Sequence, residues 1–343
     1  MKKVGVVVFV LLFLLLVGCN SNAGTETTGE NETNDKLLIY STLYPLAYFA
    51  EEIGGAYVKV ETILPPGSDP HNYEPTSKTM IDIAEADMFL FNGANLEAYA
   101  NKIKSALAEE NVMILEASDG VSLIEHIHHH EDEQAHEDEH GHEEDEQAHE
   151  DEHAHEEDET DSEHDHDHGD ADPHLWLDPI RAVELARNVK DALIELNPDQ
   201  AETFESNFHS LEEQLIALDE SFHQQLENAN NNEILVTHAA YGYWEQSYDI
   251  KQIALSGLSP SQEPSQKELE RILDHVNESN IQYLLFEQNI EPKVAEVIQS
   301  ETNVKSLQLH NLSILTEEDI ENEETYFTLM ERNLDVLNKA LEY

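Results

Sequence analysis

The chain has 343 residues, 39% of them hydrophobic, and its 17 lysines and arginines against 74 aspartates and glutamates give a formal net charge of −57. A field this negative repels phosphate backbones and anionic lipid, which excludes a nucleic-acid binder and favours cations as ligands. The single cysteine, Cys19, excludes an internal disulfide and any cysteine-rich metal site, so a metal site has to use histidines and carboxylates.

Residues 1–18 have the pattern of an export signal. A pair of lysines precedes an apolar run at 4–17, which is too short to span about 30 Å of hydrocarbon. The run ends in Leu-Val-Gly before Cys19 and resembles the lipobox of bacterial lipoproteins, which predicts cleavage there and a lipid on the Cys19 thiol. An uncleaved signal anchor is the alternative. Residues 19–35 are polar and are predicted to form a flexible tether, so the folded part begins at Lys36.

Short apolar runs alternate with helix-period segments after the tether, which is typical of strands and helices around a parallel sheet. A first series has predicted strands at 37–41, 58–64, 88–92 and 112–116 and helices at 46–53, 78–86 and 96–109. A second series has strands at 234–237, 253–255, 281–286 and 304–309 and helices at 266–277, 292–301 and 324–341. Two such series predict an α/β fold with two lobes, an N-terminal lobe at 36–124 and a C-terminal lobe at 232–343.

Residues 173–231 complete the N-terminal lobe and are almost purely helical, with one helix at 180–196 and another that starts at Pro198. The second helix carries apolar residues three or four positions apart, which form one stripe. These are Phe204, Phe208, Leu211, Leu215, Leu218, Phe222 and Leu226. A helix of about 30 residues spans roughly 45 Å, so we expect it to connect the lobes rigidly.

Residues 125–172 form an insert of a different kind, with 13 of the 20 histidines, 24 of the 74 acidic residues and a tandem repeat at 131–143 and 144–156. With almost no apolar residues it is predicted to be disordered without ligand. Two H-E-x-x-H matches, at 136–140 and 149–153, are attributed to chance because the segment has no apolar face to pack. We interpret the insert as an auxiliary metal-binding loop, although a solvated loop without a role is the alternative. Its histidines are His126, His128, His129, His130, His136, His140, His142, His149, His153, His155, His164, His166 and His168.

Three of the seven remaining histidines stand in notable settings. His71 and His174 each lie in an Asp-Pro-His turn, where proline fixes the backbone and the aspartate is predicted to orient the imidazole. His71 follows the strand predicted at 58–64, and His238 ends the strand predicted at 234–237. Because ligands in open α/β sheets bind beyond the carboxyl ends of strands, these residues predict a site in the cleft between the lobes.

The chain resembles the solute-binding lipoproteins of bacterial ABC transporters for zinc and manganese (metal-binding cluster A-I), and specifically the zinc-uptake, ZnuA/AdcA-like branch. The resemblance rests on DPHNYEP at 69–75, DPHLWLDP at 172–179, THAAYGY at 237–243, GLSPSQEPS at 257–265 and the acidic histidine-rich insert. It implies two lobes joined by a rigid helix, with the metal held between them. The matching positions make His71, His174 and His238 the three histidine ligands.

The fourth ligand position departs from the pattern of this family. Zinc-binding relatives often have a carboxylate after Asn-Leu near the last strand, whereas this chain has Ser313 there. Water, Glu74 or Glu287 is left to complete the sphere, and we expect Glu287 to accept a hydrogen bond rather than ligate. His310 is a weak candidate. Three imidazoles suit tetrahedral Zn²⁺, and a histidine at 238, where manganese-binding relatives have a carboxylate, also favours zinc.

The sequence therefore predicts a protein that is not an enzyme: a monomeric zinc-binding component of an ABC importer, with Zn²⁺ as its transported ligand. Its expected partners are the permease with its ATPase subunit and, through the lipid on Cys19, the outer face of the cytoplasmic membrane. Three alternatives stay open. They are a manganese or broad divalent-metal binder, a surface adhesin or metal store that works through the insert, and a zinc hydrolase with three histidines and a bound water.

Overall fold

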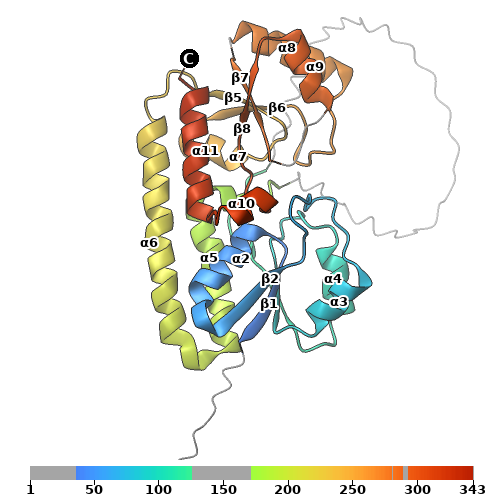
Figure 1. Cartoon of the computed structure of the whole chain (residues 1–343), viewed down its shortest axis with the longest axis vertical. Helices are drawn as coiled ribbons and strands as arrows, with labels where there is room; N and C mark the ends of the chain where they lie inside the picture. The colour runs from blue at the N-terminus through green and yellow to red at the C-terminus, as the bar shows by residue number, and fades with distance from the viewer. Residues whose placement is uncertain (1–35, 126–170, 280, 289–292, 343) are drawn as a thin grey trace, which may run out of the picture. The chain divides into compact units, whose positions relative to one another are not determined.

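The computed structural model describes residues 36–125, 171–279, 281–288 and 293–342 (Figure 1). The predicted signal segment, Cys19, the tether and the thirteen histidines of the insert lie outside these ranges. Lys36–Tyr343 form one compact unit. Within the described ranges, every helix is too short or too polar to cross a membrane.

The N-terminal lobe is built on a four-stranded parallel sheet with the order β2-β1-β3-β4. Its strands are β1 (Leu37–Ser41), β2 (Val58–Thr62), β3 (Met88–Phe91) and β4 (Met113–Glu116), and its helices are α2 (Tyr44–Gly54), α3 (Ser77–Ala84) and α4 (Ala100–Ala106). All four residues of β3 are buried, as expected for an inner strand with helices on both faces. The carboxyl ends of these strands lead into the loops that carry polar side chains.

The C-terminal lobe repeats this arrangement with the order β6-β5-β7-β8, again all parallel. Its strands are β5 (Glu233–Val236), β6 (Lys251–Ala254), β7 (Tyr283–Phe286) and β8 (Lys305–Gln308). Its helices are α7 (Gly242–Tyr248), α8 (Gln266–Glu278), α9 (Lys293–Glu301), α10 (Glu317–Glu321) and α11 (Tyr326–Ala340). The eight predicted strands are confirmed to within two residues at each end, whereas α7 and α10 were not predicted.

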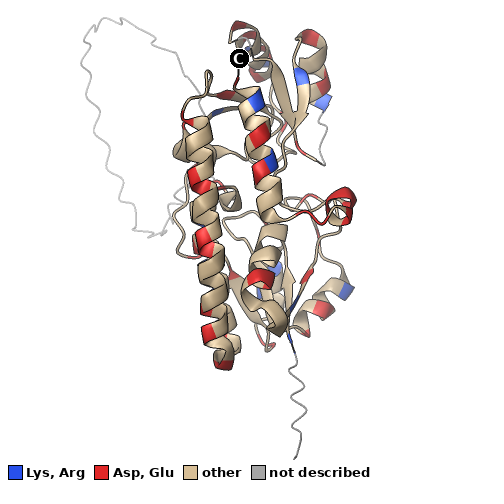
Figure 2. Ribbon diagram, turned by 60° about the vertical axis from the view of Figure 1, so that its left-hand side comes forward, with Lys and Arg blue, Asp and Glu red and all other residues tan. Residues whose placement is uncertain are grey.

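Two helices connect the lobes, α5 (Pro179–Leu196) and α6 (Ala201–Leu226). The predicted apolar stripe of α6 is entirely buried, and α6 packs on the same side against α5 and α2 and, nearer its C-terminal end, against α11 (Figure 1). Its 26 residues span about 39 Å, so the prediction of a long connecting helix is confirmed. It begins slightly later than predicted, because residues Pro198–Gln200 form a short 3-10 turn. The outer face of α6 carries acidic residues and neither lysine nor arginine (Figure 2).

A buried threonine–glutamate pair closes the carboxyl end of the N-terminal sheet. Thr42, the residue after β1, donates its hydroxyl to Oε1 of Glu97 at 2.6 Å. The same carboxylate accepts the backbone N–H groups of Asn92 at 2.8 Å and Gly93 at 3.1 Å. Burial raises the pKa of Glu97 to about 7. The Asn92 side chain then donates to the carbonyl oxygen of Pro173 at 2.9 Å, which ties this end of the sheet to the turn that carries His174.

Candidate metal centre

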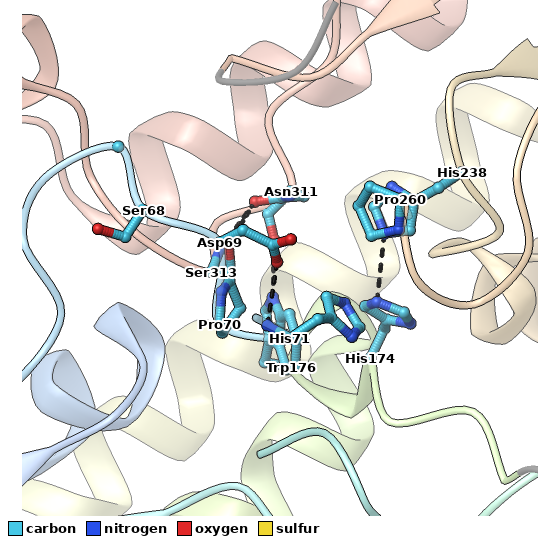
Figure 3. Close-up of a pocket in the computed structure, with 11 residues that line it drawn as sticks. Ser68, Asp69, Pro70, His71, His174, Trp176, His238, Pro260, Asn311 and Ser313 are labelled. Atoms are coloured by element: carbon cyan, nitrogen blue, oxygen red, sulfur yellow. Dashed lines mark hydrogen bonds between the residues drawn. The ribbon is translucent and has the colours of Figure 1, made fainter. Parts of the chain in front are cut away.

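Three histidines from distant parts of the chain meet between the lobes. His71 lies in the loop between β2 and α3, His174 directly precedes the 3-10 turn Leu175–Leu177, and His238 is the second residue after β5. One ring nitrogen from each lies within 4.8 Å of the other two. The ring centroids are 5.5 Å apart for His71 and His174, 6.0 Å for His71 and His238, and 5.2 Å for His174 and His238 (Figure 3). The structure therefore brings the three predicted ligand residues together.

His174 is oriented by the aspartate of its own turn. Oδ1 of Asp172 lies 2.8 Å from Nδ1 of His174 and also accepts the His174 backbone N–H at 2.9 Å. Because a carboxylate only accepts, it selects the tautomer with the proton on Nδ1 and leaves a lone pair on Nε2. That Nε2 lies 3.4 Å from Nε2 of His238. The predicted orienting role of the aspartate is confirmed in this turn.

His238 has a carboxylate in the matching place. Oε1 of Glu287 contacts Nδ1 of His238 and accepts the Thr237 hydroxyl at 3.0 Å, while Oε2 accepts the side-chain amide of Asn311. Burial alone would raise the pKa of Glu287, but the charge and hydrogen bond of His238 and the donors Asn311 and Thr237 hold it below its usual value. Both oxygens of Glu287 are thus engaged on the Nδ1 side of His238, away from the shared Nε2 positions.

His71 is held differently from the other two. The carboxylate of Asp69 accepts the backbone N–H of His71 at 3.0 Å and the side-chain amide of Asn72 at 2.6 Å, so it fixes the loop rather than the imidazole. The orienting contact predicted for this Asp-Pro-His turn therefore falls on the backbone. Burial and the neighbouring His174 lower the pKa of His71 to about 3, which keeps this imidazole neutral at physiological pH.

A small cavity of about 40 Å³ adjoins the three imidazoles (Figure 3). It is lined by Gly67, Ser68, Asp69, Pro70, His71, His174, Trp176, His238, Pro260, Asn311 and Ser313. The Ser313 hydroxyl, which stands at the expected place of a carboxylate, donates to Oδ1 of Asn311 at 2.8 Å. Glu74 is not among the lining residues. The carbonyl of Asn311 accepts the indole N–H of Trp176 at 2.7 Å, so this loop of the C-terminal lobe closes over the interlobe turn.

His310, a weak candidate from sequence, has a structural role. Its Nδ1 accepts the backbone N–H of Leu312 at 2.9 Å, and its Nε2 lies 3.1 Å from Oδ2 of Asp319. Both ring nitrogens are therefore occupied outside the histidine cluster. Sequence reasoning missed Asn311, which holds Glu287 in place. Its position two residues before Ser313, in the stretch already compared with relatives, was the available signal.

The sequence matches a known protein family over almost the whole folded part. Residues 39–340 match the family described as zinc-uptake complex component A, periplasmic (ZnuA). The chain belongs to the ZnuA family. This membership confirms the resemblance predicted from the motifs and agrees with the prediction that the chain is not an enzyme, because the family is one of uptake components.

Several individual members of the ZnuA family are similar to this chain in sequence or in structure. The zinc-binding lipoprotein AdcA of Streptococcus pneumoniae is 32% identical over 342 residues, which cover 100% of this chain and 62% of that protein. This chain therefore spans less than two thirds of the AdcA relative. The high-affinity zinc uptake system protein ZnuA of Bacillus subtilis is 30% identical over 340 residues, with 99% and 98% of the two chains covered. The crystal structure of the Zn(II)-bound ZnuA-like domain of the pneumococcal AdcA has a TM-score of 0.69 at 30% identity and covers 90% of this chain and 100% of that domain.

Proposed function

We propose that this chain is the extracytoplasmic zinc-binding component of an ABC importer, which captures Zn²⁺ with His71, His174 and His238 and delivers it to a membrane permease. The observation that carries the proposal is the 3.4 Å separation of Nε2 of His174 and Nε2 of His238. In a tetrahedral site with Zn–N bonds of 2.0–2.1 Å, neighbouring nitrogens lie roughly 3.3 Å apart. Two of the proposed ligands already have the spacing that zinc requires.

The protonation of this histidine pair supports a cation between the two rings. Asp172 and Glu287 accept at the Nδ1 positions, so both Nε2 atoms present lone pairs to each other. Two facing lone pairs repel, and a cation that binds both removes this repulsion. The low pKa of His71 also favours binding of a cation, because a neutral imidazole needs no deprotonation before it ligates.

The donor set favours zinc over manganese. The carboxylates of Asp172 and Glu287 contact Nδ1 atoms, and that of Asp69 accepts hydrogen bonds within its own loop, which leaves three imidazole nitrogens for the ion. Manganese prefers oxygen ligands, whereas imidazole suits zinc. We propose that water takes the fourth position, because a cavity of about 40 Å³ beside the rings has room for one. In this assignment Glu287 orients His238 and does not ligate.

The test is a titration of the purified protein with Zn²⁺ and with Mn²⁺ in competition with a chelator. His71→Ala, His174→Ala and His238→Ala should each weaken zinc binding by more than the 10- to 100-fold that loss of an outer hydrogen-bond partner typically costs. His209→Ala is the matched control, because that imidazole is 69% exposed on α6 and pairs with two neighbouring glutamates of the same helix. Parent-like binding in all three variants, or a preference for Mn²⁺, would contradict the assignment.

Membrane attachment through Cys19 is a further part of the proposal, although Cys19 lies outside the described residues. Support comes from the lipobox-like sequence before Cys19 and from the description of the family as periplasmic. We expect Cys19→Ser to abolish incorporation of a labelled fatty acid and to release the protein from the membrane fraction. A Cys19→Ser protein that is still labelled and still membrane-bound would exclude this anchor. The permease and its ATPase subunit are the proposed partners on that membrane.

The histidine-rich insert is proposed as an accessory that collects zinc at low affinity. Its two ends meet in an antiparallel bridge between Glu125 and Ala171, which puts them close enough for a short glycine linker to replace residues 126–170. The shortened protein should lose its weak zinc sites and keep one tight site. If the tight site disappears as well, the chain is a metal store or adhesin that works through the insert.

A further inference from the structure

Asp172, the residue behind His174, is fixed from several directions. Its backbone N–H donates to the carbonyl of Ile124 at 2.9 Å, and its own carbonyl accepts the hydroxyl of Tyr243 at 2.7 Å. The residue is only 1% exposed. A Cβ atom on Gly242 would lie 2.5 Å from Oδ2 of Asp172 and 3.1 Å from the side chain of Ile124. A glycine at position 242 therefore leaves room for the Asp172 carboxylate where it contacts His174.

Gly242 and Tyr243 belong to α7 of the C-terminal lobe, and the whole helix is attached to the turn that carries His174. The indole N–H of Trp244 donates to the carbonyl of Leu177 at 2.7 Å. The guanidinium of Arg181, at the start of α5, lies 4.5 Å from the centre of the Tyr243 ring. His174, which precedes the interlobe helices in sequence, is thus held by α7, which follows them.

We propose that Gly242 and Tyr243 are positioning residues for zinc binding, which hold the imidazole of His174 in its metal-binding tautomer and orientation through Asp172. The inference rests on the proposed function and deepens it. Neither residue is among those that line the cavity beside the three histidines. Their effect reaches the ion through one carboxylate and one imidazole.

The physical argument is the small tolerance of a metal site. Zinc–ligand distances have to hold to about 0.2 Å, so a displaced imidazole loses affinity even when the ring is intact. A methyl group on Gly242 would overlap Oδ2 of Asp172, so the carboxylate has to move, and Oδ1, which contacts Nδ1 of His174, moves with it. Removal of the Tyr243 hydroxyl takes away the hydrogen bond that it donates to the Asp172 carbonyl and loosens the same residue from its backbone side.

Two measurements on Gly242→Ala and Tyr243→Phe test the inference. Zinc titration against a chelator should show affinity reduced about 10- to 100-fold, the usual cost of losing support around a ligand. Long-range ¹H–¹⁵N spectra of the metal-free protein should show the Nδ1–H tautomer of His174 in the parent and a tautomer mixture in the variants. A change of fold stability alone does not alter this tautomer signal.

Tyr248→Phe is the matched control. Tyr248 lies on the same helix and donates its hydroxyl to Asp219 of α6 at 2.8 Å, so its loss costs a comparable hydrogen bond away from His174. The inference is overturned if Tyr243→Phe keeps the parent affinity and tautomer, or if Tyr248→Phe weakens zinc binding equally. Should Gly242→Ala fail to fold, Tyr243→Phe decides alone. A parent that binds no zinc would contradict the proposed function, while the spectra would still decide on the positioning role.

Discussion

The substitution Glu287→Gln tests whether Glu287 orients His238 or ligates the metal itself. In the parent, Oε2 of Glu287 accepts the Asn311 amide, and Asn311 cannot turn over because its Oδ1 already accepts from Gln288 and Ser313. If the new glutamine points its NH₂ group at Asn311, this group faces the NH₂ group of Asn311, and two donors meet without an acceptor. If the glutamine turns instead, its amide faces Nδ1 of His238 and moves the imidazole proton to Nε2, where it blocks the metal. Either arrangement costs zinc affinity.

The expected size of the effect follows from the hydrogen bond that this substitution removes. A hydrogen bond to a charged group contributes about 1.5–3 kcal/mol, which corresponds to roughly 10- to 150-fold in zinc affinity. Competition with a chelator at neutral pH measures this change. The control is Glu233→Gln, because Glu233 pairs with a partly exposed histidine, His275, at 3.1 Å outside the site. The absorption spectrum of the Co²⁺-loaded variant should keep the parent's band intensity, since no ligand is removed. Affinity within twofold of the parent would refute the orienting role, and a changed band intensity would make Glu287 a ligand.

Two further predictions concern stability. Burial would raise the pKa of Asp319, but hydrogen bonds from His310 and Thr316 hold that pKa well below its usual range. The ionised carboxylate therefore stabilises the fold above about pH 4, and this stabilisation is lost as the pH falls further. Asp319→Asn should therefore unfold more easily at pH 7 and lose less stability between pH 4 and pH 2 in urea titrations; an acid profile like the parent's would contradict this. Phe204→Ala removes a fully buried ring of α6 and should lower the free energy of unfolding in urea by about 3–5 kcal/mol. Ile216→Ala on the same helix, at a side chain that is 41% exposed, should lower it far less. Equal losses of unfolding free energy would show that the stripe of α6 does not support the lobes.

The sequence predicted the strands well because their apolar runs are short and bounded by turn residues, as at 37–41 and 88–92. It missed α7, which has only seven residues, among them Gly242, Tyr243 and Trp244, that show no helical periodicity. Packing of Trp244 against the interlobe turn stabilises this helix, and such a contact is invisible along the chain. The three histidines were predicted because each stands in its own local motif. The partners Asn311 and Tyr243 were not, since their roles depend on which loops the two lobes bring together.

The threonine–glutamate pair at the end of the N-terminal sheet has a counterpart in the C-terminal lobe. Thr42 binds Glu97 after β1, and Thr237 binds Glu287 after β5, with both carboxylates buried. The next residue differs, Leu43 in the first lobe and His238 in the second. Without an imidazole, burial raises the pKa of Glu97 to about 7, whereas Glu287 stays below its usual value and keeps its negative charge at neutral pH.

The carboxylate of Glu287 has the same place behind its imidazole as Asp172 has behind His174. The carboxylates of Glu287 and Asp172 each contact the Nδ1 atom of one imidazole, so the two Nε2 atoms lie on the far side of the rings, 3.4 Å apart. Under the ligation proposed above, a cation would meet these carboxylates only through the imidazoles that lie between. One histidine after a strand end that both lobes share therefore gives the buried threonine–glutamate pair of the C-terminal lobe an imidazole to orient, which the pair in the N-terminal lobe lacks.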